Sequence, residues 1–401
     1  MTNRHPFFPR LFLLFVVASL WAPLAAICQP ALPAQAFAPP TITAINDRAD
    51  LQFPGQITFR VDLAGAATIK GVTLEYGVDQ LTCGTVIAKV PLTFTPARSV
   101  KAAWTWKMAD SGSLPPGAQI HWRWRVTDAG GTQLLTEPRR VTWLDDEHNW
   151  QTLSGRQINV HWYRGSADFG RQMSSAAQGA LTTISQKLGL QGGKPIELYL
   201  YADGDEMRQA VFYKPDWTGG VAYPENRIAI IGIAPGQETW GKRAIAHEVT
   251  HIVVDTYGFS CLGSRPGWLD EGLAVYVEGG PTRAEQEQFD TALHDDELIA
   301  LSALDAGFRG DDYTVSLAYT ESFSVVDFLV THNGREKMLN TLSLLREGAA
   351  TGAALSTVYG FDEIGLETAW RTHVGAKPLV TSAGPGATGG FAGSPIVNLL
   401  D

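Results

Sequence analysis

Hydrophobic and polar residues alternate along two stretches in the first third of the chain. Over residues 57–63 and 120–126, apolar side chains occupy every second position, and Arg, Thr, Asp or His fill most positions between them. This period predicts half-buried β-strands. Turn sequences at residues 114–117 and 128–131 separate such runs. We therefore predict an all-β sandwich of immunoglobulin or fibronectin type, centred on residues 41–141 and bounded at 37–148.

The role of this predicted sandwich is open at this stage. Trp122 and Trp124 could line a carbohydrate-binding face, but their place in the alternation favours the core. A spacer or a module that presents substrate is the interpretation we prefer.

From Ile158 onward the spacing becomes mixed and then mainly helical. It predicts strands at 158–163, 195–201 and 227–233, and helices at 169–188, 204–213 and 244–258. Further helices are predicted at 267–278, 282–295, 313–332, 335–347 and 362–373. A small sheet followed by helices indicates an α+β domain, which we place at residues 149–376.

Both ends of the chain differ from these domains. Arg4 and Arg10 precede an apolar run at residues 11–20, and small residues suited to cleavage follow at 34–38. This predicts a signal peptide over residues 1–36 and a protein that is secreted or associated with the cell envelope. Retention as a signal anchor, or lipidation at Cys28, are alternatives that we rank lower. Residues 377–401 are rich in Gly, Ala, Ser and Pro and predict a disordered or extended tail.

The candidate chemistry begins with the string His247-Glu248-Val249-Thr250-His251. Positions i and i+4 share one face of a helix, so both imidazoles can bind one Zn²⁺ while Glu248 reaches a water on that metal. An apolar stripe on another face of the same helix is formed by Ile245, Val249 and Ile252. We therefore predict a helix that packs with one face and presents metal ligands with another.

A catalytic zinc site commonly needs a third protein ligand and leaves the fourth position to water. Glu271, in the segment Gly267–Tyr276, follows His251 in the sequence at a distance that allows a loop and a second helix between them. Its carboxylate would complete a His₂Glu ligand set.

These two strings together resemble those of the gluzincin metallopeptidases, and more narrowly the peptidase MA-like family of metallohydrolases. The resemblance covers roughly Trp150 to Gly375 and implies a zincin-like fold, a Zn²⁺ cofactor and a peptide or protein substrate. It implies His247, His251 and Glu271 as metal ligands and Glu248 as catalytic base. It also implies Tyr319 as the donor to the developing oxyanion, although Tyr319 could simply be a core residue.

Three further groups are candidates for supporting roles. Asp255, Asp270 and Glu278 could orient the histidines, with exposed or capping roles as the alternative. An edge strand before the metal helix could pair with an extended substrate, and Gly219 and Gly220 would allow close approach there. A plain turn and core strand would explain that segment equally well.

Cysteines and charge narrow the setting. If Cys28 leaves with the signal peptide, Cys83 and Cys261 remain, either as a disulfide or as separate thiols. The formal net charge of −10 argues against nucleic acid and anionic membrane surfaces as partners. We expect no membrane span in the mature chain.

Two functional hypotheses follow. The first is an exported zinc metallopeptidase. The second is a non-catalytic surface or binding protein whose zincin-like domain is only stabilised by metal. Glu248 favours the enzyme, because a purely structural metal site has no need of a base beside it.

Overall fold

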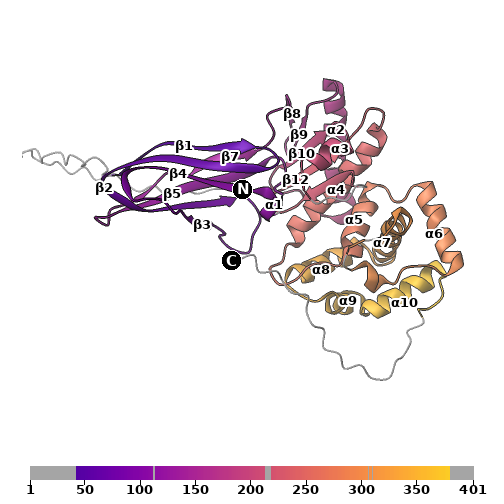
Figure 1. Ribbon diagram of the computed structural model, residues 1–401. Coiled ribbons are helices and arrows are strands. Elements are labelled where there is room, and N and C mark those ends of the chain that lie inside the picture. Colours follow the sequence, from indigo (N-terminus) through magenta and orange to yellow (C-terminus); the bar gives the residue numbers. More distant parts are fainter. Residues whose placement is uncertain (1–41, 112, 213–217, 306, 309, 380–401) are drawn as a thin grey trace, which may run out of the picture. The chain divides into compact units, whose positions relative to one another are not determined.

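The computed structural model describes residues 42–111, 113–212, 218–305, 307–308 and 310–379 (Figure 1). The predicted signal peptide, Cys28 and all but the first residues of the predicted tail lie outside these ranges. Among the described helices, none has the length and apolar character that a membrane crossing requires.

The N-terminal region is built from antiparallel strands. They are β1 (Ile42–Gln52), β2 (Gln56–Val78), β3 (Ala88–Pro91), β4 (Ala97–Lys107), β5 (Ala118–Asp128), β6 (Gln133–Leu135) and β7 (Arg139–Trp143), with a short helix α1 (Met108–Ser111) after β4. The long strand β2 changes partners along its length, from β1 and β4 in its first half to β3 and β5 in its second. The strands β6 and β7 pair with β5, so all seven strands belong to one hydrogen-bonded sheet.

The alternation of the sequence is reproduced in the burial of this region. Phe59 on β2 and Trp124 on β5 are fully buried, and Trp122 is nearly so. Both indole N–H groups donate to Asp47 Oδ1, at 2.8 and 3.0 Å. These tryptophans are therefore core residues, as the alternation favoured. The more specific assignment to an immunoglobulin or fibronectin sandwich stays a prediction.

A second, mixed sheet follows. Its strands are β8 (Gln151–Ser154), β9 (Ile158–Trp162), β10 (Ile196–Tyr201), β11 (Gly220–Tyr223) and β12 (Ile228–Gly232), in the order β11-β12-β10-β9-β8. The three inner strands are parallel, and each edge strand runs antiparallel to its neighbour. Every residue of β12 is buried. A strand that is buried on both faces has a continuous apolar sequence instead of alternating apolar and polar residues.

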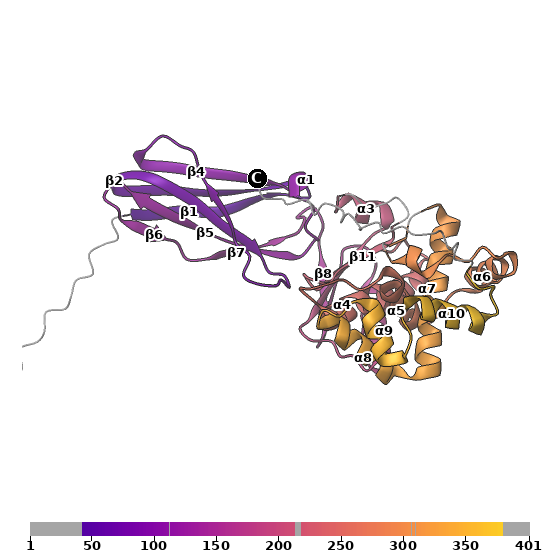
Figure 2. The same cartoon turned by 90° about the horizontal axis from the view of Figure 1, so that it is seen from below.

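Helices cover this sheet and continue beyond it (Figure 1). They are α2 (Ala167–Leu188), α3 (Gly204–Gln209), α4 (Glu238–Gly258), α5 (Gly267–Glu278), α6 (Arg283–Asp295), α7 (Asp312–Asn333), α8 (Arg335–Arg346), α9 (Thr351–Tyr359) and α10 (Glu363–Val374), with a 3₁₀ turn at Leu301–Leu304. The helix α4 packs against β11, β12, α2 and α5, and α5 packs along α7. The last three helices, which Figure 2 shows in the helical part of the chain, pack in sequence: α8 on α4 and α7, α9 on α8, and α10 on α9 and α7. This mixed arrangement confirms the α+β class.

Three details of the sequence-based prediction were wrong. The strand predicted at 227–233 is β12, and it lies inside the sheet. The edge strand is β11, in a segment whose glycines had suggested a turn. The helix predicted to reach residue 213 ends at Gln209. The helix predicted to begin at residue 244 begins at Glu238, and it ends, as predicted, at Gly258. A Cβ there would lie 2.4 Å from Arg265 Nη1, so this glycine makes room for a side chain.

Cys83 and Cys261 are bonded to each other, with their Cα atoms 5.7 Å apart. Cys83 lies between β2 and β3, and Cys261 lies in the loop from α4 to α5. Of the two alternatives left open by the sequence, the structure contains the disulfide.

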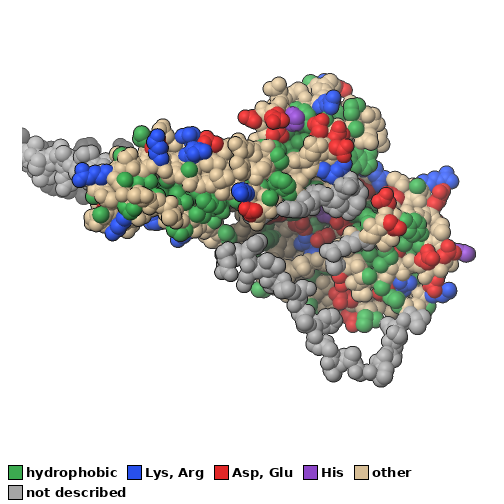
Figure 3. Space-filling view, viewed as in Figure 1, with side chains coloured by type: hydrophobic (Ala, Val, Ile, Leu, Met, Phe, Trp, Pro, Cys, Tyr) green, Lys and Arg blue, Asp and Glu red, His purple; other side chains and the backbone are tan. Residues whose placement is uncertain are grey.

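On the face drawn in Figure 3, basic side chains lie along the strands of the N-terminal region, and acidic side chains gather over the helical part. The chain contains 41 acidic and 31 basic residues. On this face, the acidic side chains lie mainly over the helical part of the chain.

Candidate metal centre

The helix α4 divides into an apolar and a polar face, as its sequence predicts. Ile245, Val249 and Ile252 are fully buried and belong to the core that this helix shares with β12 and α2. His247 and His251 lie on another face and remain partly accessible. The packing of the first face fixes the direction in which the two imidazoles point.

The structure brings His247, His251 and Glu271 together. The two Nε2 atoms are 3.1 Å apart, and they lie 3.2 and 3.3 Å from Glu271 Oε2. Glu271 comes from the first turns of α5, which packs directly on α4. These three residues are the metal-ligand candidates that the sequence suggested, and we call them the His-His-Glu triangle.

The dimensions of the triangle match a metal site. Ligand atoms that are about 2.0–2.1 Å from a tetrahedral zinc ion are about 3.4 Å from one another. The observed separations of 3.1 to 3.3 Å are close to this value. In addition, two neutral imidazoles that face each other through Nε2 need a proton or a cation between them. The donor set therefore fits a divalent cation.

The electrostatics of the triangle favour positive charge. Burial lowers the pKa of His247, but hydrogen bonds with Glu271 and Glu278 outweigh it, so the pKa lies well above its usual value. Burial raises the pKa of Glu271, and the two histidines outweigh it, so this carboxyl stays ionised far below its usual range. A cation at the centre would take the place of the protons.

Glu248 lies beside the triangle under the edge strand. Its side chain is almost completely buried, and a Cβ at Gly220 of β11 would come within 2.8 Å of its Oε1 atom. The close approach that the sequence suggested for Gly220 is therefore present, and its neighbour is Glu248. Burial, followed by the charges of Glu271 and Glu278, raises the pKa of Glu248 against the effect of the histidines. A carboxylate with a raised pKa is a better proton acceptor.

Glu278 holds the first histidine from behind. Its Oε2 atom lies 3.1 Å from His247 Nδ1, and its Oε1 accepts a hydrogen bond from Arg243 at 2.8 Å. Arg243 also donates to the carbonyl of Gly280. A carboxylate on the second ring nitrogen fixes the tautomer and orientation of a ligating histidine. Of the three orienting candidates, Glu278 is the one in this position.

Asp255 and Asp270 have a different partner, the guanidinium of Arg265. Arg265 pairs with Asp255, one turn after His251 on α4, and with Asp270 at 2.6 Å, next to Glu271 on α5. Its side chain is buried against Gly258. Arg265 thus ties together the two helices that carry the triangle. No motif in the sequence pointed to Arg265 or to Arg243.

Tyr319 reaches the same place from α7. Its ring centroid is 5.9 Å from that of His247, and Phe308 packs on it edge to face. Burial, together with Glu271 and Glu248, raises the pKa of its hydroxyl, which therefore stays protonated. Tyr319 is thus a side chain of the site wall, whereas Phe323, one turn later, stacks on Tyr276.

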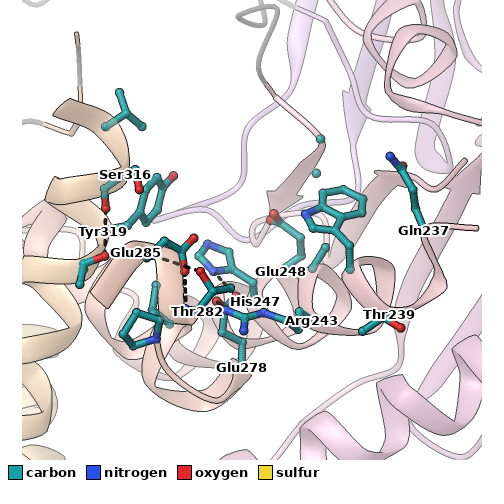
Figure 4. Close-up of a pocket in the computed structure, with 18 of the residues that line it drawn as sticks. Gln237, Thr239, Arg243, His247, Glu248, Glu278, Thr282, Glu285, Ser316 and Tyr319 are labelled. Atoms are coloured by element: carbon teal, nitrogen blue, oxygen red, sulfur yellow. Dashed lines mark hydrogen bonds and ion pairs between the residues drawn. The ribbon is translucent and has the colours of Figure 1, made fainter. Parts of the chain in front are cut away.

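Two cavities are lined by residues of this group. One has a volume of about 800 Å³ and the other about 380 Å³. Both are lined by Gly220, His247, Glu248 and Tyr319. Figure 4 shows the larger one, with Tyr319 and Ser316 projecting from α7 and with Glu248, His247 and Arg243 projecting from α4. All three residues of the triangle line the smaller cavity, whereas of the three only His247 lines the larger one.

Comparison with solved structures gives several matches. The M1 zinc metallopeptidase from Deinococcus radiodurans is 12% identical, with 82% of this chain and 91% of that chain covered and a TM-score of 0.36. An aminopeptidase N family protein from Idiomarina loihiensis is 9% identical, with coverage of 76% and 71% and a TM-score of 0.39. Aminopeptidase A from Legionella pneumophila, in complex with aspartic acid, is 13% identical, with coverage of 82% and 50% and a TM-score of 0.36.

Comparison with curated proteins gave no match. The family comparison did. The model of the Peptidase MA superfamily matches residues 176–376, half of the chain and the part that includes α4, α5 and α7. The resemblance first suggested by the HExxH string and by Glu271 is thereby confirmed, and the chain belongs to the Peptidase MA superfamily.

Proposed function

We propose that this protein is an exported zinc-dependent metallopeptidase that hydrolyses peptide bonds with Glu248 as general base. One observation carries the proposal: three ligand atoms within 3.3 Å of one another belong to residues that line the smaller cavity, and a buried carboxylate, Glu248, lies beside them. The alternative of a binding protein with a merely structural metal accounts for the triangle but gives no reason for Glu248 or for the cavities.

His247, His251 and Glu271 would hold the zinc ion. A zinc ion held there supplies a Lewis acid that makes a water more acidic and polarises a substrate carbonyl. Glu248 takes the proton from the attacking water, and the same carboxyl then delivers it to the amine as the C–N bond breaks. Glu278 keeps His247 in the orientation that this chemistry needs.

The substrate would be held by the edge strand and by Tyr319. Within the described residues, β11 has a strand partner on one side only. An extended peptide can pair with its free edge, close to Glu248. The Tyr319 hydroxyl would donate a hydrogen bond to the oxyanion that develops on the carbonyl oxygen. The N-terminal β region would act as a spacer or would present the substrate.

Export rests on two features of the chain. The first is the charged and then apolar sequence at the N-terminus, which predicts a cleaved signal peptide. The second is the bond between Cys83 and Cys261, because disulfides persist mainly in oxidising compartments. A secreted or cell-envelope location follows from the proposal.

The test compares the wild-type protein with Glu248→Gln, which preserves the shape of the side chain. We expect both proteins to retain zinc, as measured by elemental analysis, and only the wild type to cleave casein or a peptide library. The loss in kcat should be about 10²- to 10⁴-fold, the usual contribution of a general base. Equal turnover by the variant would remove Glu248 from the mechanism, and zinc-loaded wild type that cleaves nothing in the library would favour the binding protein.

A further inference from the structure

Trp240 lies on the face of α4 that carries the first histidine of the triangle. It precedes His247 by seven residues, which is two helical turns and about 10.5 Å along the helix axis. Arg243 and Ala244 lie between them, and all four residues line the 800 Å³ cavity. Residues from Gln237 to His247 therefore form one continuous wall of that cavity, as Figure 4 shows for Gln237, Arg243 and His247.

The indole of Trp240 is exposed although large aromatic side chains are usually covered. Its exposed fraction is 43%, against 1% for Trp268 on the neighbouring helix α5. On its other side the ring packs on the backbone of Gly219. A Cβ there would lie 2.7 Å from two of the ring carbons, Cη2 and Cζ2. Because Gly219 directly precedes β11, the indole lies next to the start of the strand that is proposed to pair with substrate.

Two charged residues that line this cavity, Arg243 and Glu285, have partners. Arg243 is held by Glu278 and by the carbonyl of Gly280, and Glu285 Oε2 accepts a hydrogen bond from the backbone of Thr282. The exposed indole is a large apolar surface next to Arg243, whose charge is already paired. A ligand side chain that covers it gains hydrophobic and ring-packing energy without displacing an ion pair.

We propose that Trp240 is a substrate-specificity residue, and that it binds an apolar or aromatic side chain three residues from the scissile bond. This rests on the proposed peptidase function. An extended peptide advances about 3.4 Å per residue, so a peptide that runs along α4 covers the rise of about 10.5 Å from His247 to Trp240 in three residues. The substrate is therefore an extended polypeptide segment that reaches at least three residues to one side of the cleaved bond.

The test uses the zinc-loaded full chain and internally quenched peptides built around a cleaved bond located by mass spectrometry. Each position up to four residues on either side is varied among Phe, Leu, Ala, Lys and Glu. For wild type, kcat/KM should favour Phe or Leu over Ala at one position three residues from the bond. In Trp240→Ala this ratio should fall by about 10- to 30-fold, the cost of truncating one binding hot spot.

Two controls define the result. Trp240→Phe should keep most of the preference, and Ile364→Ala, which removes an exposed apolar side chain on α10, should keep all of it. A preference for Lys at that position, or a profile that Trp240→Ala leaves unchanged, would overturn the proposal.

A binding measurement separates this proposal from the proposed function. Fluorescence anisotropy of a labelled Phe-containing peptide with the Glu248→Gln protein reports on the subsite without turnover. Trp240→Ala in that background should weaken binding by a similar factor. An unchanged affinity overturns the assignment of Trp240 even if the wild type is an active peptidase. A weakened affinity supports it even if the wild type turns over none of the peptides.

Discussion

Two clusters of buried charge in the helical part of this chain differ in their access to the two cavities described above. The His-His-Glu triangle joins α4 and α5, all three of its residues line the smaller cavity, and His247 also lines the larger one. The other cluster consists of Glu321 on α7 with Glu367 and Arg371 on α10. It borders neither of these two cavities, and its three side chains are at least as buried as Glu248. We call it the α7–α10 ion cluster.

The two clusters differ in what their polar atoms meet. In the α7–α10 ion cluster, Arg371 pairs with Glu367 at 2.9 Å and donates to the carbonyls of Leu298 and Ile299. Glu367 and Glu321 accept hydrogen bonds from the backbone of Leu301 and Ile299. This cluster therefore holds the connection between α6 and α7. In the triangle, three ligand atoms converge on one another and on open space. A reactive site is therefore indicated by ligand atoms that converge on one point and by access to a cavity, more than by buried charge alone.

The largest expected effect on stability comes from Arg371→Met. The change leaves Glu367 buried without its partner, so we expect a loss of about 3–5 kcal/mol in the free energy of unfolding, measured with urea. Zinc affinity should change little. If Glu367 is replaced by Leu at the same time, much of the lost stability should return. If the protein with only the Arg371→Met change has wild-type stability, a structural role for the Arg371–Glu367 pair is contradicted.

The corresponding change in the triangle is Glu271→Ala. Loss of a ligand should weaken zinc binding more than loss of a residue that only hydrogen-bonds to a ligand, which costs up to about 100-fold. We therefore expect the zinc affinity to fall by more than about 100-fold, as measured by chelator competition. Asp312→Asn, which alters a carboxylate that lines the larger cavity, is the matched control and should bind zinc like the wild type. Undiminished affinity in Glu271→Ala would refute the assignment of Glu271 as third ligand.

Glu278→Gln tests the support behind His247. The variant retains an acceptor for Nδ1 but loses the charge that pairs with Arg243. We expect zinc affinity to fall by about 10- to 100-fold, as is usual for such outer carboxylates. In a cobalt-substituted protein the visible absorption spectrum should shift, because the orientation of the imidazole changes. Unaltered affinity and spectrum would make Glu278 a purely structural partner of Arg243.

The smallest effect concerns Glu321 and pH. Burial raises the pKa of this carboxyl to about 8, against the opposing effects of the Ile299 N–H and Arg371, and its Oε2 atom is buried with no hydrogen-bond partner in the described part of the chain. The folded state therefore favours the protonated form. The stabilisation that comes from the raised pKa of Glu321 is complete below the pKa of this group in the unfolded chain, near 4.3. It is lost as the pH rises towards 8, the pKa in the folded protein.

Glu321→Gln should remove this dependence. We expect the variant to exceed the wild type by about 1–3 kcal/mol in unfolding free energy at pH 8 and to match it near pH 4. Urea denaturation across that range gives the comparison. Parallel stability curves for the two proteins would show that Glu321 is ionised without cost.

Particular residues show how far the sequence could be interpreted. The helix Gly267–Glu278 was predicted with the bounds it has, because an apolar period and a helix-terminating Gly279 are local signals. The helix Thr351–Tyr359 was missed, because it is only nine residues long, has Gly352 in its first turn and begins at Ala350 without a side-chain cap. The strand β11 was also missed, because a strand of four half-buried residues carries hardly any period of its own.

The sequence by itself determined which residues are available for catalysis: two histidines and a base on one helix and a carboxylate on the next. It also determined the apolar faces that orient these two helices. These are consequences of helical and strand periodicity, which depends on neighbours in the chain. Only the tertiary structure decided that Glu278 supports His247, that Arg265 joins Asp255 to Asp270, and that Trp240 borders the cavity. Those relations depend on how helices pack across the fold, and no spacing along the chain records that packing.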